Sequence, residues 1–92
     1  MQSVIKENPV VMLMVTFKWC RPCKMFAKKY RDFAAQFPSA VLLKVMGDES
    51  EVSKAMLKRL NVKLSPTFVL WQGGERVGSH SGANEAKVRQ ML

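Results

Sequence analysis

The sequence predicts a single α/β domain in which a mixed sheet of about four strands is flanked by helices. Three observations favour this class: two apolar runs enclose a helical stripe, a tight Gly73-Gly74 turn joins two later strands, and the elements follow the order β-α-β-α-β-β-α. A strand, a helix and a strand within about 37 residues form a unit with parallel strands and a right-handed crossover. A chain of 92 residues supports one modest core, so we assign residues 1–92 to one domain.

The first half of the chain supplies the βαβ unit. Residues 2–8 are expected to be the tail of a helix that ends before Pro9. The apolar run of residues 10–17, VVMLMVTF, predicts a strand that is buried on both faces. A helix is expected over residues 21–37, with Pro22 in its first turn, where the missing N–H costs nothing. Its apolar face carries aromatic residues at helical spacing, namely Phe26, Tyr30, Phe33 and Phe37.

The second half of the chain adds two strands and two helices. A buried strand is predicted at Ala40–Met46, AVLLKVM, and a helix with an apolar stripe follows over residues 52–60. The strands Thr67–Gln72 and 76–81 are expected to form a β-hairpin across the two glycines. Asn84 is a suitable N-cap for a last helix, which supplies further apolar contacts.

The charge of the chain is strongly basic. Fifteen Lys and Arg against seven Asp and Glu give a net charge of +8, which raises the question of a nucleic-acid or anionic-membrane partner. The basic residues are dispersed, however, and no zinc-finger spacing or RNA-binding aromatic signature accompanies them. The apolar run of residues 10–15 is far shorter than the roughly 20 residues that cross a bilayer, and Glu7 and Pro9 do not fit a secretory leader. We therefore expect no nucleic-acid and no membrane partner, and attribute the charge to solubility and to attraction toward acidic proteins.

The two cysteines, Cys20 and Cys23, form a C-x-x-C motif. A structural zinc ion needs four ligands, and His80 is the only other candidate nitrogen, so we expect no metal and no cofactor. A secreted disulfide framework would require more bridges. The remaining interpretation is a redox dithiol.

The dithiol is placed at the start of the predicted long helix. A helix N-terminus offers unpaired N–H donors and about half a positive charge, which can lower a cysteine pKa from about 8.5 to about 3.5–7.5. Cys20 is expected at the exposed cap as the attacking sulfur, and Cys23, one turn later and further inside, as the resolving sulfur. Lys18, Arg21 and Lys24 add positive charge nearby.

Five segments together resemble one known family. Residues 19–24, WCRPCK, resemble the W-C-G-P-C-K active site of thioredoxins, and residues 65–67, SPT, look like the cis-proline turn of that family. Residues 73–75 are similar to its hairpin turn, Gly82 falls where thioredoxins place a glycine, and residues 41–48 are similar to its third strand. The resemblance covers nearly the whole chain and implies a thioredoxin-like fold.

The resemblance also implies an enzyme, a protein disulfide oxidoreductase. Cys20 would attack a substrate disulfide, Cys23 would resolve the mixed disulfide, and a disulfide reductase would regenerate the dithiol. Lys18, Lys24 and Lys44 would modulate the pKa of the cysteines. The implied substrate groove consists of Trp19, Arg21, Pro22, Ser65, Pro66, Thr67 and Gly82.

Two departures from the family pattern affect the chemistry. Met14 stands where thioredoxins carry a buried Asp, so we expect Cys23 to resolve mixed disulfides more slowly than in a Met14→Asp variant. Lys44 loses the partner that this Asp provides, and we expect it to reach solvent, contact water or become neutral. Arg21 replaces the usual Gly, which predicts a potential less negative than about −270 mV, unless its charge is fully solvated.

A third departure concerns the N-terminal part, since only 19 residues precede Cys20. We expect the first strand of the family to be missing, which leaves Ala40–Met46 as a sheet edge. A monomer is expected, with self-association possible through this edge. A reducing compartment is expected, cytoplasmic or mitochondrial after processing. The alternative function is a non-catalytic thioredoxin-like binding or redox-sensing module.

Overall fold

The computed structural model describes residues 2–92 and contains four helices and four strands in this part of the chain. The predicted order of elements from the first strand onward is confirmed, and the helix expected before Pro9 is also present, ending at Glu7. The elements are α1 (Gln2–Glu7), β1 (Val10–Thr16), α2 (Arg21–Gln36), β2 (Ala40–Met46), α3 (Glu51–Leu60), β3 (Thr67–Gln72), β4 (Glu75–Ser81) and α4 (Glu85–Met91).

The four strands form one mixed sheet in the order β2-β1-β3-β4. β1 and β2 are parallel, as the βαβ interpretation predicts, and β1 pairs antiparallel with β3 on its other side. β3 and β4 form the predicted antiparallel hairpin. Within residues 2–92, β2 pairs with β1 alone, so the expectation that Ala40–Met46 lies at a sheet edge is confirmed. This order places β1, the strand that leads into the dithiol, near the middle of the sheet.

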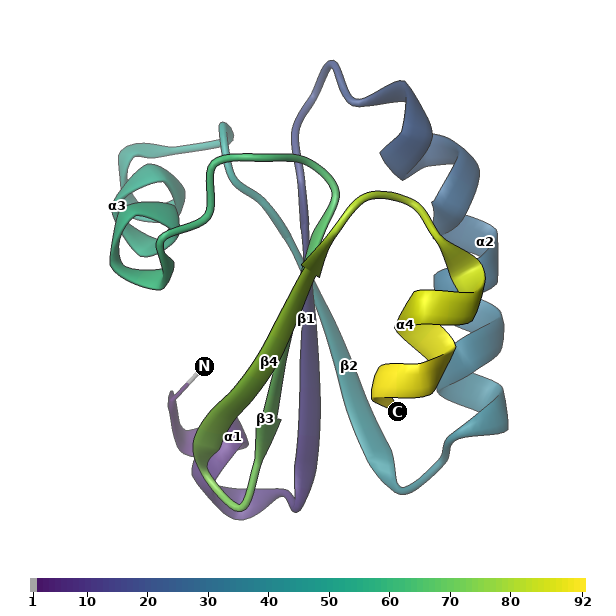
Figure 1. Cartoon of the computed structure of the whole chain (residues 1–92). Helices are drawn as coiled ribbons and strands as arrows, with labels where there is room; N and C mark the ends of the chain where they lie inside the picture. Colours follow the sequence, from purple (N-terminus) through teal and green to yellow (C-terminus); the bar gives the residue numbers. More distant parts are fainter. Residues whose placement is uncertain (1) are drawn as a thin grey trace.

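Helices cover both faces of the sheet, with α2 and α4 on one side and α1 and α3 on the other (Figure 1). Side chains of β1 alternate between the two sides, because successive residues of a strand point to opposite faces. Met12 and Met14 belong to the cluster under α2, whereas Val11, Leu13 and Val15 belong to the cluster under α1 and α3. The predicted burial of this strand on both faces is therefore confirmed.

The aromatic stripe of α2 fixes this helix against the sheet. Phe26, Tyr30 and Phe33 are buried, and the Tyr30 hydroxyl donates a hydrogen bond of 2.6 Å to the Leu43 carbonyl of β2. Burial raises the pKa of Tyr30 well above its ordinary value, because it disfavours the charged phenolate. The helix ends at Gln36, one residue before the predicted end, with Phe37 as its C-cap.

Several element boundaries follow from local capping. Ser50 accepts a hydrogen bond of 3.1 Å from the Ser53 N–H, so α3 begins at Glu51. Asn61 closes the same helix in the left-handed conformation, with φ of 58°. The Asn84 side chain caps α4 by accepting from the Lys87 N–H, as its sequence position predicts.

Candidate active site

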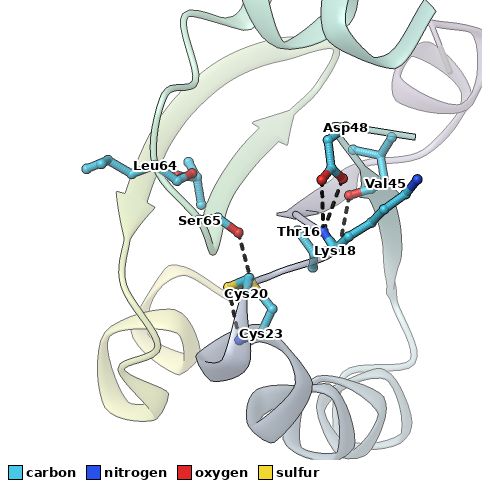
Figure 2. Close-up of a disulfide and its surroundings, with 9 residues drawn as sticks. Thr16, Lys18, Cys20, Cys23, Val45, Asp48, Leu64 and Ser65 are labelled. Atoms are coloured by element: carbon cyan, nitrogen blue, oxygen red, sulfur yellow. Dashed lines mark hydrogen bonds between the residues drawn. A yellow bond between two sulfur atoms is a disulfide. The ribbon is translucent and has the colours of Figure 1, made fainter. Parts of the chain in front are cut away.

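The two cysteines lie where β1 passes into α2. Cys20 is the N-cap of α2, and its sulfur accepts a hydrogen bond of 3.2 Å from the Cys23 N–H. Cys20 and Cys23 are joined by a disulfide, with an S–S distance of 2.06 Å and a Cα–Cα distance of 5.2 Å (Figure 2). The helix therefore directs one of its unpaired N–H groups at the sulfur that the sequence nominates as the nucleophile.

The exposure of the two cysteines needs one correction. The sequence places Cys20 at an exposed cap, but the residue is only 9% exposed, against 3% for Cys23. Cys20 is covered because its sulfur turns back onto the first turn of α2, where it bonds both the Cys23 N–H and the Cys23 sulfur. The order of exposure agrees with the expected roles, although the difference is small.

The turn before the disulfide is tied to the end of β2. Both carboxylate oxygens of Asp48 accept from the Lys18 N–H at 3.1 Å (Figure 2). The Thr16 carbonyl accepts from the Gly47 N–H at 2.7 Å. Asp48 is not among the site residues that the sequence predicts. The available signal was its place just after a strand parallel to β1, because the carboxyl ends of parallel strands meet at one edge of the sheet.

An open hollow of about 540 Å³ lies beside the disulfide. Of the residues predicted for a substrate groove, Trp19, Arg21, Pro22 and Ser65 line it. Trp19 is 90% exposed and Leu64 is 64% exposed, so both add exposed apolar surface to the lining of the hollow. Four further lining residues, from three separate loops, were not predicted from the sequence. They are Phe17, Asp48, Lys63 and Leu64.

The other predicted groove residues, Pro66, Thr67 and Gly82, are not among the residues that line this hollow. Pro66 and Thr67 are buried, and Pro66 follows a cis peptide bond after Ser65, as the resemblance implies. The Thr67 hydroxyl donates to the Leu64 carbonyl at 2.6 Å, and the Gly82 N–H donates to the Pro66 carbonyl at 2.8 Å. Gly82 has φ of 112°, a conformation that favours glycine. Pro66, Thr67 and Gly82 therefore support the loop of Ser65 instead of lining the hollow.

The surroundings of Cys23 differ from those of Cys20. The Ser65 hydroxyl lies 2.9 Å from the Cys23 sulfur (Figure 2). A smaller hollow of about 240 Å³ adjoins Cys23, and its basic lining residues are Lys18, Lys24 and Lys44. The structure thus brings together the three lysines that the sequence nominates as modulators.

The structure shows how the chain accommodates Met14 in place of the buried Asp of thioredoxins, and where Lys44 lies without that partner. Met14 is fully buried and pairs with Lys44 across β1 and β2. Lys44 is exposed, so of the three expected outcomes the structure shows the one in which its ammonium reaches solvent.

Two further residues, Trp71 and His80, do not line either hollow beside the disulfide. Trp71 is buried within the cluster under α1 and α3. His80 is half-buried in β4, and within residues 2–92 its Nε2 has no hydrogen-bond partner. Among the described residues, no three His, Cys, Asp or Glu side chains gather as metal ligands, and no helix is both long and apolar enough to span a membrane.

Comparison with known protein families matches residues 1–92 to the family described as Thioredoxin. The chain belongs to the thioredoxin family. Its relatives include Thioredoxin 1 of Plasmodium falciparum, which is 32% identical over 90 residues, or 98% of this chain and 84% of the relative. A chloroplastic F-type thioredoxin of Mesembryanthemum crystallinum is 37% identical over 82 residues, and this chain spans 41% of its length.

Solved structures agree with this assignment. Mitochondrial Thioredoxin 3 from Saccharomyces cerevisiae, in its oxidized form, superimposes with a TM-score of 0.90 and 29% identity, over 97% of this chain and 81% of the other. Fasciola hepatica thioredoxin gives a TM-score of 0.87 and 31% identity, over 97% and 85% of the two chains. With the family shown and the Cys20–Cys23 disulfide in place, this protein is a thiol-disulfide oxidoreductase that acts by dithiol exchange.

Proposed function

We propose that this protein reduces disulfides of protein substrates, with Cys20 as the attacking sulfur and Cys23 as the resolving sulfur. The observation that carries the proposal is the position of the Cys20 sulfur, which caps α2, accepts the Cys23 N–H and borders the larger hollow. A helix N-terminus stabilises a thiolate more than a thiol, so Cys20 is the sulfur prepared for attack. Cys23 lies one turn further in, on the side away from an arriving substrate.

The proposed reaction is two successive exchanges. The Cys20 thiolate attacks one sulfur of the substrate disulfide, a Cys20–substrate bond forms, and the other substrate sulfur leaves with the electron pair and takes a proton. Cys23 then attacks Cys20 as a thiolate, the Cys20–Cys23 bond forms, and the second substrate sulfur leaves. The substrate gains two electrons and two protons, and the protein ends as the disulfide.

The larger hollow favours a substrate segment of particular chemistry. Arg21 and Lys63 are basic lining residues, while Asp48 is already engaged by the Lys18 N–H. Trp19 and Leu64 add exposed apolar surface. We propose that an extended segment with acidic and apolar residues lies here, beside the backbone of Ser65, and that the net charge of +8 promotes its approach.

The finer biological setting is also a proposal. A disulfide reductase would return two electrons to the Cys20–Cys23 disulfide after each cycle. The working unit is the monomer, and the edge of β2 is the position at which a second copy would pair. The compartment is a reducing one, the cytoplasm or, after processing, the mitochondrion.

Reduction of insulin by a dithiol reductant tests the proposed function against the alternative of a non-catalytic module. The wild-type protein is expected to accelerate the reduction, and the Cys20→Ser variant to leave it at the uncatalysed rate. Equal rates for the two proteins would favour a binding or sensing role. If the Cys20→Ser variant still binds an insulin chain, its lower rate reflects the missing thiol and not a damaged substrate groove.

A further inference from the structure

The resolving sulfur has an unfavourable setting for its chemistry. Cys23 is 3% exposed and belongs to the cluster that includes Met14, Phe26 and Phe68. Burial among apolar side chains raises the pKa of a thiol, because it disfavours the charged form. Only the thiolate attacks a disulfide, so resolution requires a group that stabilises negative charge on this sulfur.

Ser65 is the side chain that meets this requirement. Its hydroxyl lies 2.9 Å from the Cys23 sulfur, and among the described residues it is the side chain that forms a hydrogen bond with that atom, which is also bonded covalently to Cys20. A disulfide sulfur has no proton, so in the oxidised protein the hydroxyl is the donor and the sulfur the acceptor. The same donor would serve a thiolate better, because hydrogen bonds to charged acceptors are about twice as strong as those between neutral groups.

The loop around Ser65 holds this hydroxyl in place. Thr67 donates to the Leu64 carbonyl at 2.6 Å on one side of Ser65, and Gly82 donates to the Pro66 carbonyl at 2.8 Å on the other. The loop is thereby fixed to the end of β4, so the hydroxyl is positioned before the reaction begins. A donor that needs no rearrangement stabilises developing charge most effectively.

The lysines near Cys23 cannot take over this role directly. Lys18, Lys24 and Lys44 border the adjoining hollow, and all three side chains are exposed. Their charges act on Cys23 through solvent, which weakens them. Acidic residues are absent from the lining of this hollow, so no carboxylate there accepts the Cys23 proton.

We propose that Ser65 is a further catalytic residue, whose hydroxyl donates to the Cys23 sulfur and stabilises its thiolate during resolution. The inference rests on the proposed function, since it assigns Cys23 the resolving role. The Cys23 proton leaves to water or hydroxide in the adjoining hollow, which at about 240 Å³ has room for water. The thiolate then bonds to Cys20, the Cys20–substrate bond breaks, and the electron pair leaves with the substrate sulfur.

The reaction of the reduced protein with dithiobis(nitrobenzoate), which has two phases, tests the inference. Attack by Cys20 on the reagent releases one thionitrobenzoate, and attack by Cys23 on the resulting mixed disulfide releases the second in a step independent of protein concentration. Near neutral pH, Ser65→Ala is expected to slow the second release about tenfold, which corresponds to one unit in the pKa of Cys23. The slowing is expected to vanish at high pH, where the thiolate is fully formed.

Matched variants separate the hydroxyl from the shape of the side chain. Ser65→Thr retains a hydroxyl and is expected to keep a rapid second phase, whereas Ser65→Val has a similar shape and is expected to behave like Ser65→Ala. Ser81→Ala removes a nearby hydroxyl that contacts Thr67 at 3.0 Å and is expected to leave the pH profile in place. In the Cys20→Ser background, ultraviolet titration of the remaining thiol should show the same order of pKa values.

The results distinguish failure of this inference from failure of the proposed function. A second phase that is unchanged in Ser65→Ala and Ser65→Val, or slowed equally at every pH, would overturn the role of the hydroxyl. If the wild-type protein instead shows no second release and no insulin reduction, the proposed function itself is wrong. The Thr and Val variants keep the test decisive even if Ser65→Ala loses stability.

Discussion

The two sulfurs of one disulfide occupy different chemical surroundings. Cys20 borders an open hollow with basic and apolar walls, formed by residues such as Arg21, Trp19 and Leu64. Cys23 faces a hydroxyl and a smaller, basic hollow, and its other neighbours are core side chains. Under the proposed function, the Cys20 side of the disulfide selects the substrate, and the Cys23 side sets how fast that substrate is released.

This division arises from elements that are distant in the sequence. Both sulfurs belong to the first turn of α2, so the helix alone does not distinguish them beyond the direction of its N–H groups. The loop before β3 contributes Ser65 to the Cys23 side and Leu64 to the Cys20 side. In the proposed mechanism, neighbouring residues of this single loop therefore serve the two halves of the reaction.

The largest expected effect comes from removing one sulfur at a time. Cys23→Ser should retain attack by Cys20 but stop after the first exchange, so a covalent mixed disulfide accumulates and turnover is lost. Cys20→Ser should form no such adduct with the same substrate. Non-reducing electrophoresis or mass spectrometry detects the adduct. Accumulation in Cys20→Ser instead would reverse the assignment of the two sulfurs.

A charge reversal at the open hollow tests its part in partner choice. Lys63→Glu is expected to lower kcat/KM about tenfold for a peptide disulfide flanked by glutamates, and to weaken its dependence on salt. Lys87→Glu, the same charge change on the exposed surface of α4, is the matched control. Equal effects of both variants would show that net charge, and not the hollow, attracts acidic substrates.

Substitution of Arg21 tests whether a residue that lines the larger hollow also affects the redox potential of the disulfide. A cation beside Cys20 stabilises the reduced, thiolate form, so Arg21→Gly should make the potential more negative, by about 30 mV for each unit of increase in the Cys20 pKa. Equilibration with glutathione measures the change, and Arg21→Lys should retain most of the wild-type value. An unchanged potential together with an unchanged Cys20 pKa would indicate that solvent screens the exposed guanidinium.

The smallest expected effect concerns Tyr30, in the cluster on the Cys23 side. Because burial raises its folded-state pKa, the protonated phenol stabilises the fold fully below about pH 10, and this contribution is lost as the pH rises further. Tyr30→Phe should cost about 1 kcal/mol at neutral pH through the lost bond to Leu43, and this cost should shrink above about pH 10. Denaturant unfolding across this range measures it. A cost that does not change with pH would contradict the prediction.

Much of the fold follows from patterns that are local in the sequence. The strands were predictable because β-branched and apolar runs lie between clear turns, and Asn84 marked the start of α4 by ordinary capping chemistry. The dithiol was equally accessible, since Pro22 and the aromatic stripe from Phe26 onward place Cys20 at a helix start. These signals depend only on near neighbours along the chain.

The rest of the site depends on contacts between distant segments. Ser65 and Cys23 are separated by 42 residues, and no periodicity indicates that their side chains meet. Asp48 and Lys63 reach the open hollow only because β1 lies between β2 and β3 in the sheet. The burial of Thr67 was missed for the same reason, because its hydroxyl is satisfied by Leu64 and Ser81 within the folded loop.

The cap of α2 has one more consequence. Helices usually begin on an inert oxygen of Ser, Thr, Asp or Asn, whereas this one begins on the atom that exchanges electrons. As an anion, that atom is a stronger acceptor for the helix amides than it is within a disulfide. The stability of the first turn of α2 and the stability of the reduced protein are therefore coupled. A substitution that destabilises this turn should also shift the redox equilibrium toward the oxidised protein.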